Sequence, residues 1–349
     1  MIGELFQFIN SVFAIFLIVA IIIMDIIFII TVVFFERKDP SATLAWVMTL
    51  IFLPVIGFIL YLFLGQNYRK EKMFRLKKEA DQKLTAFIES QKKELKEGSS
   101  RGLVTDQMSA PLYRMILMLL ENNGALLTVN NRVKIFTDGN DKFAELIRDI
   151  GGARDYIHLE YYIWKNDGLG NDMRVALTER ARAGVEVRLL CDGLGCAGLP
   201  RHFFDEFKAA GGKVVFFFPS FLRILNLRYN FRNHRKIAVI DGKIGYVGGF
   251  NIGDDYLGKD KVWGYWRDTA VRIEGQAALT CEVRFFLDWN YAAKEDPMEY
   301  DHRYFPDTPL TPGVPIQIVS GGPDTEFNPV KEAYIKMINT ATESVYLQT

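Results

Sequence analysis

The sequence has few cysteines and histidines, and it has no excess of positive or negative charge. Its three cysteines, Cys191, Cys196 and Cys281, form no C-x-x-C pair, which argues against a disulfide framework and favours a reducing compartment. The four histidines are too scattered to complete a zinc site. A formal net charge of zero argues neither for nor against nucleic acid. At 349 residues the chain is long enough for more than one domain.

One of the four histidines lies in a motif. His234, Lys236 and Asp241 read H-x-K-x-x-x-x-D. Histidine can be a nucleophile or a general acid near neutral pH. A lysine two residues on along a strand points to the same face, so its charge can meet the same phosphate. The apolar residues 237–240 predict a buried strand that carries these side chains to its edge. The alternative is a structural histidine on a basic loop whose ring nitrogens are hydrogen-bonded. The full H-x-K-x-x-x-x-D pattern favours the catalytic interpretation over this one.

This motif resembles the catalytic motif of the phospholipase D superfamily, with Gly249 and Asn251 following it in a Gly-Gly-x-Asn segment. The resemblance implies two such motifs, one histidine forming a phosphohistidine and the other protonating the leaving alcohol, without a metal or other cofactor. It implies that His234 is the nucleophile or the acid, and that Lys236 and Asn251 bind phosphate. Gly249 and Asp241 then have supporting roles.

Two acidic residues are further candidates for the site. In the superfamily an acidic residue after the motif holds the histidine ring in position, and Asp268 is the matching residue here. A surface pair with Arg267 is the alternative for Asp268. Residues 157–164 resemble a cardiolipin synthase pattern, in which Glu160 is an expected neighbour of the active site. For His158 we favour packing within a strand.

The amino-terminal residues predict a membrane anchor. Phe13 to Phe35 is apolar apart from Asp25 and one threonine, and 23 residues span a bilayer. The cost of Asp25, about 3 kcal/mol, is smaller than the gain from roughly twenty apolar residues. A signal peptide would need a cationic start and a shorter apolar region. Thr43 to Leu64 predicts a second span that is broken by Pro54 and Gly57, and neighbouring helices can tolerate such breaks.

These spans predict a transmembrane hairpin over residues 1–68, with both ends on one side, followed by a basic helical stalk over residues 69–110. The basic residues after the hairpin are Arg69, Lys70, Lys72, Arg75, Lys77 and Lys78. By the positive-inside rule they predict a multi-pass protein of the inner or plasma membrane with a cytoplasmic catalytic domain. Contact of these residues with anionic headgroups is equally favoured. Residues 37–46 and 53–61 resemble the membrane hairpin of bacterial cardiolipin synthases.

From residue 111 onward, expected strands and helices alternate, which predicts an α/β fold. The expected strands are 133–136, 156–164, 185–191 and 213–218, and the expected helices are 142–150 and 173–183. The resemblance implies a phospholipase D-like α/β/α sandwich for a first catalytic domain over residues 111–305.

A repeat indicates the start of a second, incomplete domain at residues 306–349. Five residues match five later ones at one constant offset: Ile150, Ala153, Ile157, Leu159 and Glu160 match Ile338, Ala341, Val345, Leu347 and Gln348. The pattern predicts a helix at 330–338 and a strand at 344–348. A second motif would follow His234 by about 190 residues. We therefore expect a fragment of a longer parent, or half-sites that pair between chains.

The resemblance implies a cardiolipin synthase. Such an enzyme transfers a phosphatidyl group from one phosphatidylglycerol to another and releases glycerol, through a phosphohistidine. Phosphatidylglycerol and anionic membrane lipid are the expected partners, nucleic acid is not, and a homo-oligomer is left open. The alternatives are a phospholipase D that uses water, another phosphatidyltransferase, and a catalytically silent membrane fragment.

Overall fold

The computed structural model describes residues 2–35, 40–61, 82–96, 109–217, 232–262, 264–307, 313–322 and 328–347. They fall into two units. The described residues up to 61 belong to a helical amino-terminal unit, and those from 82 onward belong to the catalytic body.

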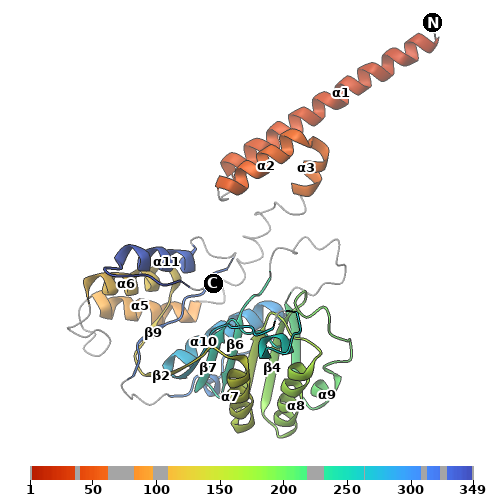
Figure 1. Ribbon diagram of the computed structural model, residues 1–349. Coiled ribbons are helices and arrows are strands. Elements are labelled where there is room, and N and C mark those ends of the chain that lie inside the picture. The colour runs from red at the N-terminus through yellow and green to blue at the C-terminus, as the bar shows by residue number, and fades with distance from the viewer. Residues whose placement is uncertain are drawn as a thin grey trace. The chain divides into compact units, whose positions relative to one another are not determined.

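The amino-terminal unit begins with one long apolar helix, α1 (Ile2–Ile30), which continues as the π-helical turn η1 (Thr31–Phe35) (Figure 1). Val12–Phe34 is long and apolar enough to cross a membrane, with a mean hydropathy of 3.3. Most of its described side chains are not covered by other residues of the protein. That exposure suits a helix surrounded by lipid, as predicted for the first span.

The second apolar segment is divided into two short helices, α2 (Pro40–Phe52) and α3 (Pro54–Leu60). Pro54 has no N–H to continue the α2 hydrogen bonds. Beside it, α3 packs against α2, because Gly57 leaves room: a Cβ there would lie 2.7 Å from the Thr49 carbonyl oxygen. The 13 residues of α2 reach about 20 Å, short of a hydrocarbon core of about 30 Å.

The predicted second span at 43–64 is therefore not one continuous helix in the described residues. Among these residues, only α1 has the length of a membrane span. Residues 62–64 and the basic run from 69 to 78 lie outside the described part of the chain.

The catalytic body is built around a seven-stranded sheet in the order β2-β8-β7-β6-β3-β4-β5. The strands are β2 (Asn131–Phe136), β3 (Tyr156–Tyr161), β4 (Glu186–Asp192), β5 (Lys213–Phe217), β6 (Lys236–Ile240), β7 (Ile244–Gly248) and β8 (Ala270–Gly275). β3, β4 and β5 are parallel, whereas β6 is antiparallel to β3. The start of β6 thus lies at the carboxyl ends of β3 and β4, in the middle of the sheet.

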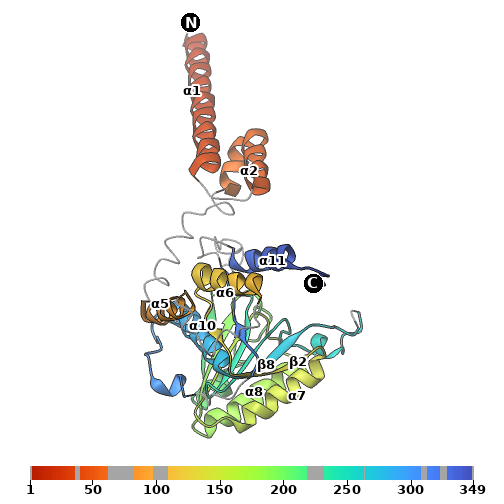
Figure 2. The same cartoon turned by 90° about the vertical axis from the view of Figure 1, so that its left-hand side faces the viewer.

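Helices cover both faces of this sheet (Figures 1 and 2). α7 (Gly139–Gly152), α8 (Gly168–Arg182) and α9 (Asp205–Ala209) lie on one face, and α10 (Gln276–Ala292) lies on the other. Asp138 and Asp167 cap α7 and α8 by accepting backbone N–H bonds in their first turns. The predicted α/β/α sandwich is confirmed, although both helices begin earlier than predicted and β3 ends at Tyr161.

A smaller layer joins the expected stalk to the expected second domain. Its elements are α5 (Gln82–Lys96), α6 (Ala110–Asn123), β1 (Leu127–Thr128), β9 (Ile316–Gln317) and α11 (Pro329–Thr340). α6 packs against both α5 and α11, and β1 pairs with β9. α5 confirms a helix in the stalk, and α11 confirms the helix predicted by the repeat. The strand predicted at 344–348 is not formed: residues 343–347 are irregular and exposed, and Gln348 lies outside the described residues.

Candidate active site

His234 and Lys236 meet at the start of β6. The Lys236 ammonium donates to the His234 carbonyl oxygen at 2.7 Å and lies 3.0 Å from the imidazole Nδ1. A charged ammonium has no lone pair, so Nδ1 must accept, and a neutral ring then carries its proton on Nε2. The Tyr162 ring lies against the imidazole with 4.4 Å between centroids. The structure thus brings together the two residues that the motif predicts to act on one phosphate.

The pKa values of this pair favour a charged lysine and a neutral histidine at neutral pH. Burial lowers the pKa of Lys236 to about 8, against the opposing charge of Asp268. Burial and the Lys236 charge also lower the pKa of His234 below its usual value, and the Asp192 carboxylate opposes this. In this neutral tautomer the lone pair lies on Nδ1, so attack on phosphorus requires the Lys236 ammonium to move from Nδ1 to a phosphate oxygen.

Asn233 fixes the backbone just before the histidine. Its side-chain amide donates to the Glu160 carboxylate, and its backbone N–H donates to Asp192 Oδ2 at 3.1 Å. Its Oδ1 accepts the Arg235 backbone N–H at 3.2 Å. All three side chains of this cradle, Glu160, Asp192 and Asn233, are buried.

The cradle explains one expected residue and adds two that sequence reasoning missed. Glu160 was expected to be a neighbour of the site, and it reaches the segment of His234 through Asn233. Asp192 and Asn233 were not predicted. A signal was present for Asp192, because it ends the strand parallel to the one that carries Glu160, and the carboxyl ends of parallel strands form one edge.

Arg235 anchors the backbone just after the histidine. Its Nη1 forms an ion pair of 2.8 Å with Asp288 of α10, which is fully buried. Its Nη2 donates to the Gly321 carbonyl oxygen at 3.2 Å. Arg235 therefore ties the motif to the opposite helical layer and to the segment around residue 321.

Asn251 is buried, and its side-chain amide is already engaged in hydrogen bonds. Its Oδ1 accepts the Ile163 backbone N–H at 3.1 Å, and its Nδ2 donates to the Tyr256 hydroxyl at 2.6 Å. An amide nitrogen has two hydrogens, so one remains for a phosphate oxygen. These bonds orient the side chain before any substrate arrives.

Asp268 lies near Lys236, and it is packed against Gly249. Its Oδ1 accepts the Thr269 backbone N–H at 2.7 Å, and its charge acts on the pKa of Lys236. A Cβ at Gly249 would lie 2.0 Å from that same Oδ1, so the glycine makes the space that Asp268 occupies. The imidazole of His234 contacts Lys236 and Tyr162. Asp268 was expected to hold this ring in position, and that role stays a prediction.

Asp241, the third residue of the motif, was expected to have a supporting role, and in the structure its carboxylate contacts backbone N–H groups away from His234 and Lys236. It lies at the other end of β6, beside the start of β3. Its carboxylate accepts the backbone N–H groups of Arg154, Asp155 and Tyr156, each at 2.9 Å. Asp241 and Gly242 both have positive φ, 51° and 63°, as in an Asp-Gly turn between paired strands. The aspartate of the motif therefore holds the strand ends together.

His158 has the structural role that was favoured for it. It is fully buried, with Nδ1 2.9 Å from Glu282 Oε1 and Nε2 3.5 Å from Glu186 Oε1. Burial opposes its charge, but the two carboxylates raise its pKa above the usual value. The Phe285 ring stacks on the imidazole. The side chain joins β3 to α10 inside the core.

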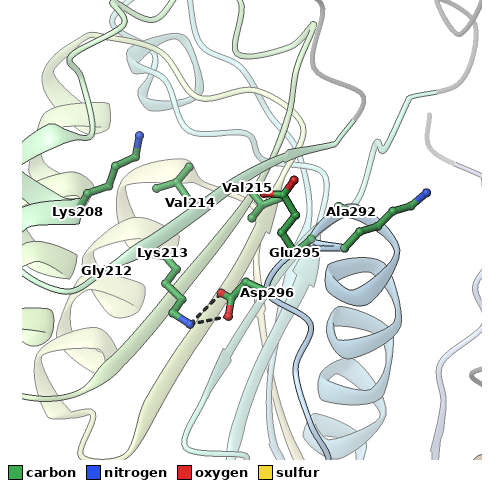
Figure 3. A pocket seen from close by; sticks show the side chains of 10 residues that line it. Lys208, Gly212, Lys213, Val214, Val215, Ala292, Glu295 and Asp296 are labelled. Carbon is green, nitrogen blue, oxygen red and sulfur yellow. Dashed lines mark hydrogen bonds and ion pairs between the residues drawn. The ribbon is translucent and has the colours of Figure 1, made fainter.

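A groove of about 520 Å³ lies at the β5 edge of the sheet (Figure 3). Lys208, Lys213 and Lys294 line it together with Glu295 and Asp296. The ammonium of Lys213 is paired with the Asp296 carboxylate at 2.8 Å. The groove contains no residue of the histidine motif or of its cradle, so it is separate from the candidate active site.

Comparisons with known proteins match both parts of the chain. Residues 23–66 match the family described as Phospholipase_D-nuclease N-terminal, and residues 146–278 match the Cardiolipin synthase, PLD-like domain. Cardiolipin synthase from Staphylococcus aureus strain Mu50 is 46% identical over 327 residues, 94% of this chain and 66% of that protein. Major cardiolipin synthase ClsA from Bacillus subtilis strain 168 is 45% identical over 94% of this chain and 67% of that protein.

Among solved structures, phosphatidylserine synthase from Haemophilus influenzae Rd KW20 has a TM-score of 0.39 at 14% identity, covering 50% of this chain and 41% of that one. The chain spans about two thirds of the length of the curated relatives it matches: 66% of the protein from S. aureus. The match at residues 23–66, together with the apolar helix α1, indicates membrane association. Because 94% of this chain aligns with ClsA at 45% identity, the chain belongs to the cardiolipin synthase family of phospholipase D-like proteins.

Proposed function

We propose that this chain carries a half-site of a membrane-bound cardiolipin synthase. The enzyme would transfer the phosphatidyl group of one phosphatidylglycerol to the terminal hydroxyl of a second one, releasing glycerol. The observation that supports this best is the contact between a neutral His234 and a charged Lys236 at the centre of the sheet. The names of the relatives point to the same reaction.

The proposed chemistry has two displacements at phosphorus. In the first, an imidazole nitrogen forms a bond to phosphorus, the bond to the glycerol oxygen breaks, and a second acid protonates that oxygen. In the second, the conjugate base of that acid takes the proton of the acceptor hydroxyl, the acceptor oxygen attacks phosphorus, and the bond between phosphorus and the imidazole breaks. His234 is either the attacking group or the acid. Lys236 and the remaining N–H of Asn251 would hold the phosphate oxygens.

The wider setting is also a proposal. We propose two membrane passages within residues 1–68 of the inner or plasma membrane, a stalk to residue 110 and a cytoplasmic catalytic domain over residues 111–305. We also propose that residues 306–349 begin a second domain, which would bring the second histidine; pairing in a homo-oligomer is the other source of that histidine. Two features support the second domain: the repeat, and the length of the relatives.

The test is a His234→Ala variant of the synthase that contains these residues, assayed with labelled phosphatidylglycerol. We expect cardiolipin formation to fall by several orders of magnitude, because a nucleophile or acid is removed. His202→Ala is the matched control, since His202 is exposed in a turn outside the site. A folded His234→Ala protein with near-normal turnover would refute the assignment. Phosphatidic acid in place of cardiolipin as the main product would show that water is the acceptor.

A further inference from the structure

A narrow arm extends from the sheet between η3 (Asp254–Leu257) and β8 (Figure 2). It comprises residues 258–267. The arm turns at Asp260, whose carbonyl oxygen accepts the Gly264 N–H at 2.9 Å and whose Oδ1 accepts the Val262 N–H at 2.7 Å. Gly264 has a φ of +64°, which a residue without a Cβ adopts readily. The described residues on the two sides of position 263 are therefore held by hydrogen bonds to Asp260.

Apolar and aromatic side chains on this arm are strongly exposed. Val262 is 85% exposed, Tyr265 62% and Trp266 39%. The sequence has a further tryptophan at position 263, which lies outside the described residues. Three basic residues on the arm are also exposed: Lys259, Lys261 and Arg267. Neighbouring apolar side chains that are exposed to water often mark a surface for a partner or a membrane. Tryptophan, tyrosine and basic residues together are typical of a membrane interface.

The base of the arm is part of the candidate active site. The Trp266 ring lies 5.7 Å from the Tyr256 ring, centroid to centroid. The Tyr256 hydroxyl in turn accepts the Asn251 amide N–H at 2.6 Å. Asp268 follows the arm directly and acts on the charge of Lys236. The arm is therefore connected, through Trp266 and Tyr256, to Asn251, which is proposed to bind phosphate.

We propose that residues 258–267 are a docking arm that enters the headgroup layer of an anionic lipid bilayer. Val262 would reach the boundary with the acyl chains, and the basic residues would meet lipid phosphates. The exposed parts of Tyr265 and Trp266 would lie among the headgroups, while their contacts with the Thr137 carbonyl oxygen and the Tyr256 ring hold them at the body. Lys259 would exchange its present ion pair with Asp254, at 3.2 Å, for such a phosphate. The choice of a lipid partner rests on the proposed function. Docking would bring His234 to the depth at which phosphodiesters lie.

The test measures the depth of the arm tip directly. The 349-residue chain is reconstituted in vesicles of equal parts phosphatidylglycerol and phosphatidylcholine, as a Val262→Cys variant that carries a fluorophore. The three native cysteines are buried, and labelled wild-type protein gives the background. Val175→Cys is the matched control, because Val175 is a 45% exposed valine on α8.

We expect lipids with a nitroxide near the headgroup to quench the label at 262 several-fold more strongly than the label at 175. Equal quenching at the two positions would overturn the proposal. Self-quenching at 262 that rises with protein density, with lipid quenching at the control level, would also overturn it, because the arm would then contact another protein.

A second variant separates docking from catalysis. Val262→Asp combined with Lys261→Glu should raise KM for phosphatidylglycerol in vesicles at least several-fold and leave kcat unchanged, since neither residue belongs to the catalytic machinery. With phosphatidylglycerol dispersed in detergent micelles, the variant should match the wild type. An unchanged KM in vesicles would count against docking. Quenching at 262, together with no cardiolipin formation by the complete synthase in which the KM is measured, would refute the proposed function and leave the docking arm in place.

Discussion

Among single residues, Lys236 has the property that is easiest to measure. Burial lowers its pKa to about 8, so its charge is present below that pH and is lost as the pH rises through it. We expect kcat/KM to fall on the alkaline side near pH 8, because phosphate binding needs the cation. Lys236→Arg should move this fall to higher pH, since arginine stays protonated, at the cost of lower activity. A pH–rate profile of both proteins checks this, and an unchanged alkaline limb in the variant would contradict it.

The acid side of the same profile reports on His234. Its pKa is lowered from the usual value by burial and by Lys236. A histidine that attacks phosphorus must be neutral, so kcat/KM should rise through this lowered pKa as the pH increases. A rate that instead falls over that range would show that His234 acts as the acid.

Asn233 is predicted to position the histidine without touching substrate. Asn233→Ala removes the amide that donates to the buried Glu160 carboxylate and the Oδ1 that accepts the Arg235 backbone N–H, which should cost about 1–3 kcal/mol of folding stability. The backbone N–H that donates to Asp192 remains in the variant. We also expect a drop in kcat larger than the loss of folded protein explains. Asn290→Ala is the control, since it removes two comparable hydrogen bonds to Met298. Equal kcat values for the two folded variants would refute a positioning role.

At the scale of elements, the two ends of β6 carry residues of one motif that have different roles: Lys236 at the candidate active site and Asp241 at a turn between strands. Lys236 begins the strand, and Asp241 follows its end, about 13–17 Å away along an extended chain. Asp241→Ala should lower the melting temperature, because three backbone N–H groups lose their acceptor. The kcat of the folded fraction should stay within a few-fold of wild type. Asp241→Asn, which keeps an acceptor oxygen and tolerates positive φ, should be milder, and thermal unfolding with active-site titration distinguishes the outcomes.

The sequence predicted those elements whose signal is local. The apolar run Ile237-Ala238-Val239-Ile240 correctly predicted the buried strand β6, and the helix end predicted at residue 183 lies one residue beyond the end of α8. The role of Asp241 was missed, although Asp241-Gly242 is itself a hairpin signal. The second span was predicted with breaks at Pro54 and Gly57, but hydropathy does not report that α3 packs back on α2 through Gly57.

Long-range contacts were beyond the reach of local patterns. Asn233 reaches Glu160 across 73 positions, and Asp192 across 41. Only the pairing of β3 with β4 and β6 brings these side chains together. For the same reason the partner of Arg235, Asp288 on α10, could not be predicted from the motif.

For the molecule as a whole, the proposed reaction draws its positive charge from the chain itself. Lys236 supplies a cation, and Asn251 supplies an N–H, at the position where phosphate would bind. We therefore expect the complete synthase to keep its activity after treatment with a chelator and dialysis. A loss of activity that added magnesium or another divalent ion restores would contradict this prediction. Protein denatured by the treatment would be recognised by its unfolding curve.

The two contacts that flank His234 have a mechanical consequence. The peptide before it is fixed by Asn233 to the Glu160 and Asp192 carboxylates, and the residue after it is fixed by Arg235 to α10. The backbone of the exposed histidine is thus held on both sides, and its side chain can rotate about χ1 and χ2 once its contacts with Lys236 and Tyr162 are released. The side chain of His234 can therefore change its rotamer while its backbone keeps its position. It can swing onto phosphorus and back, and the strand beneath it need not move.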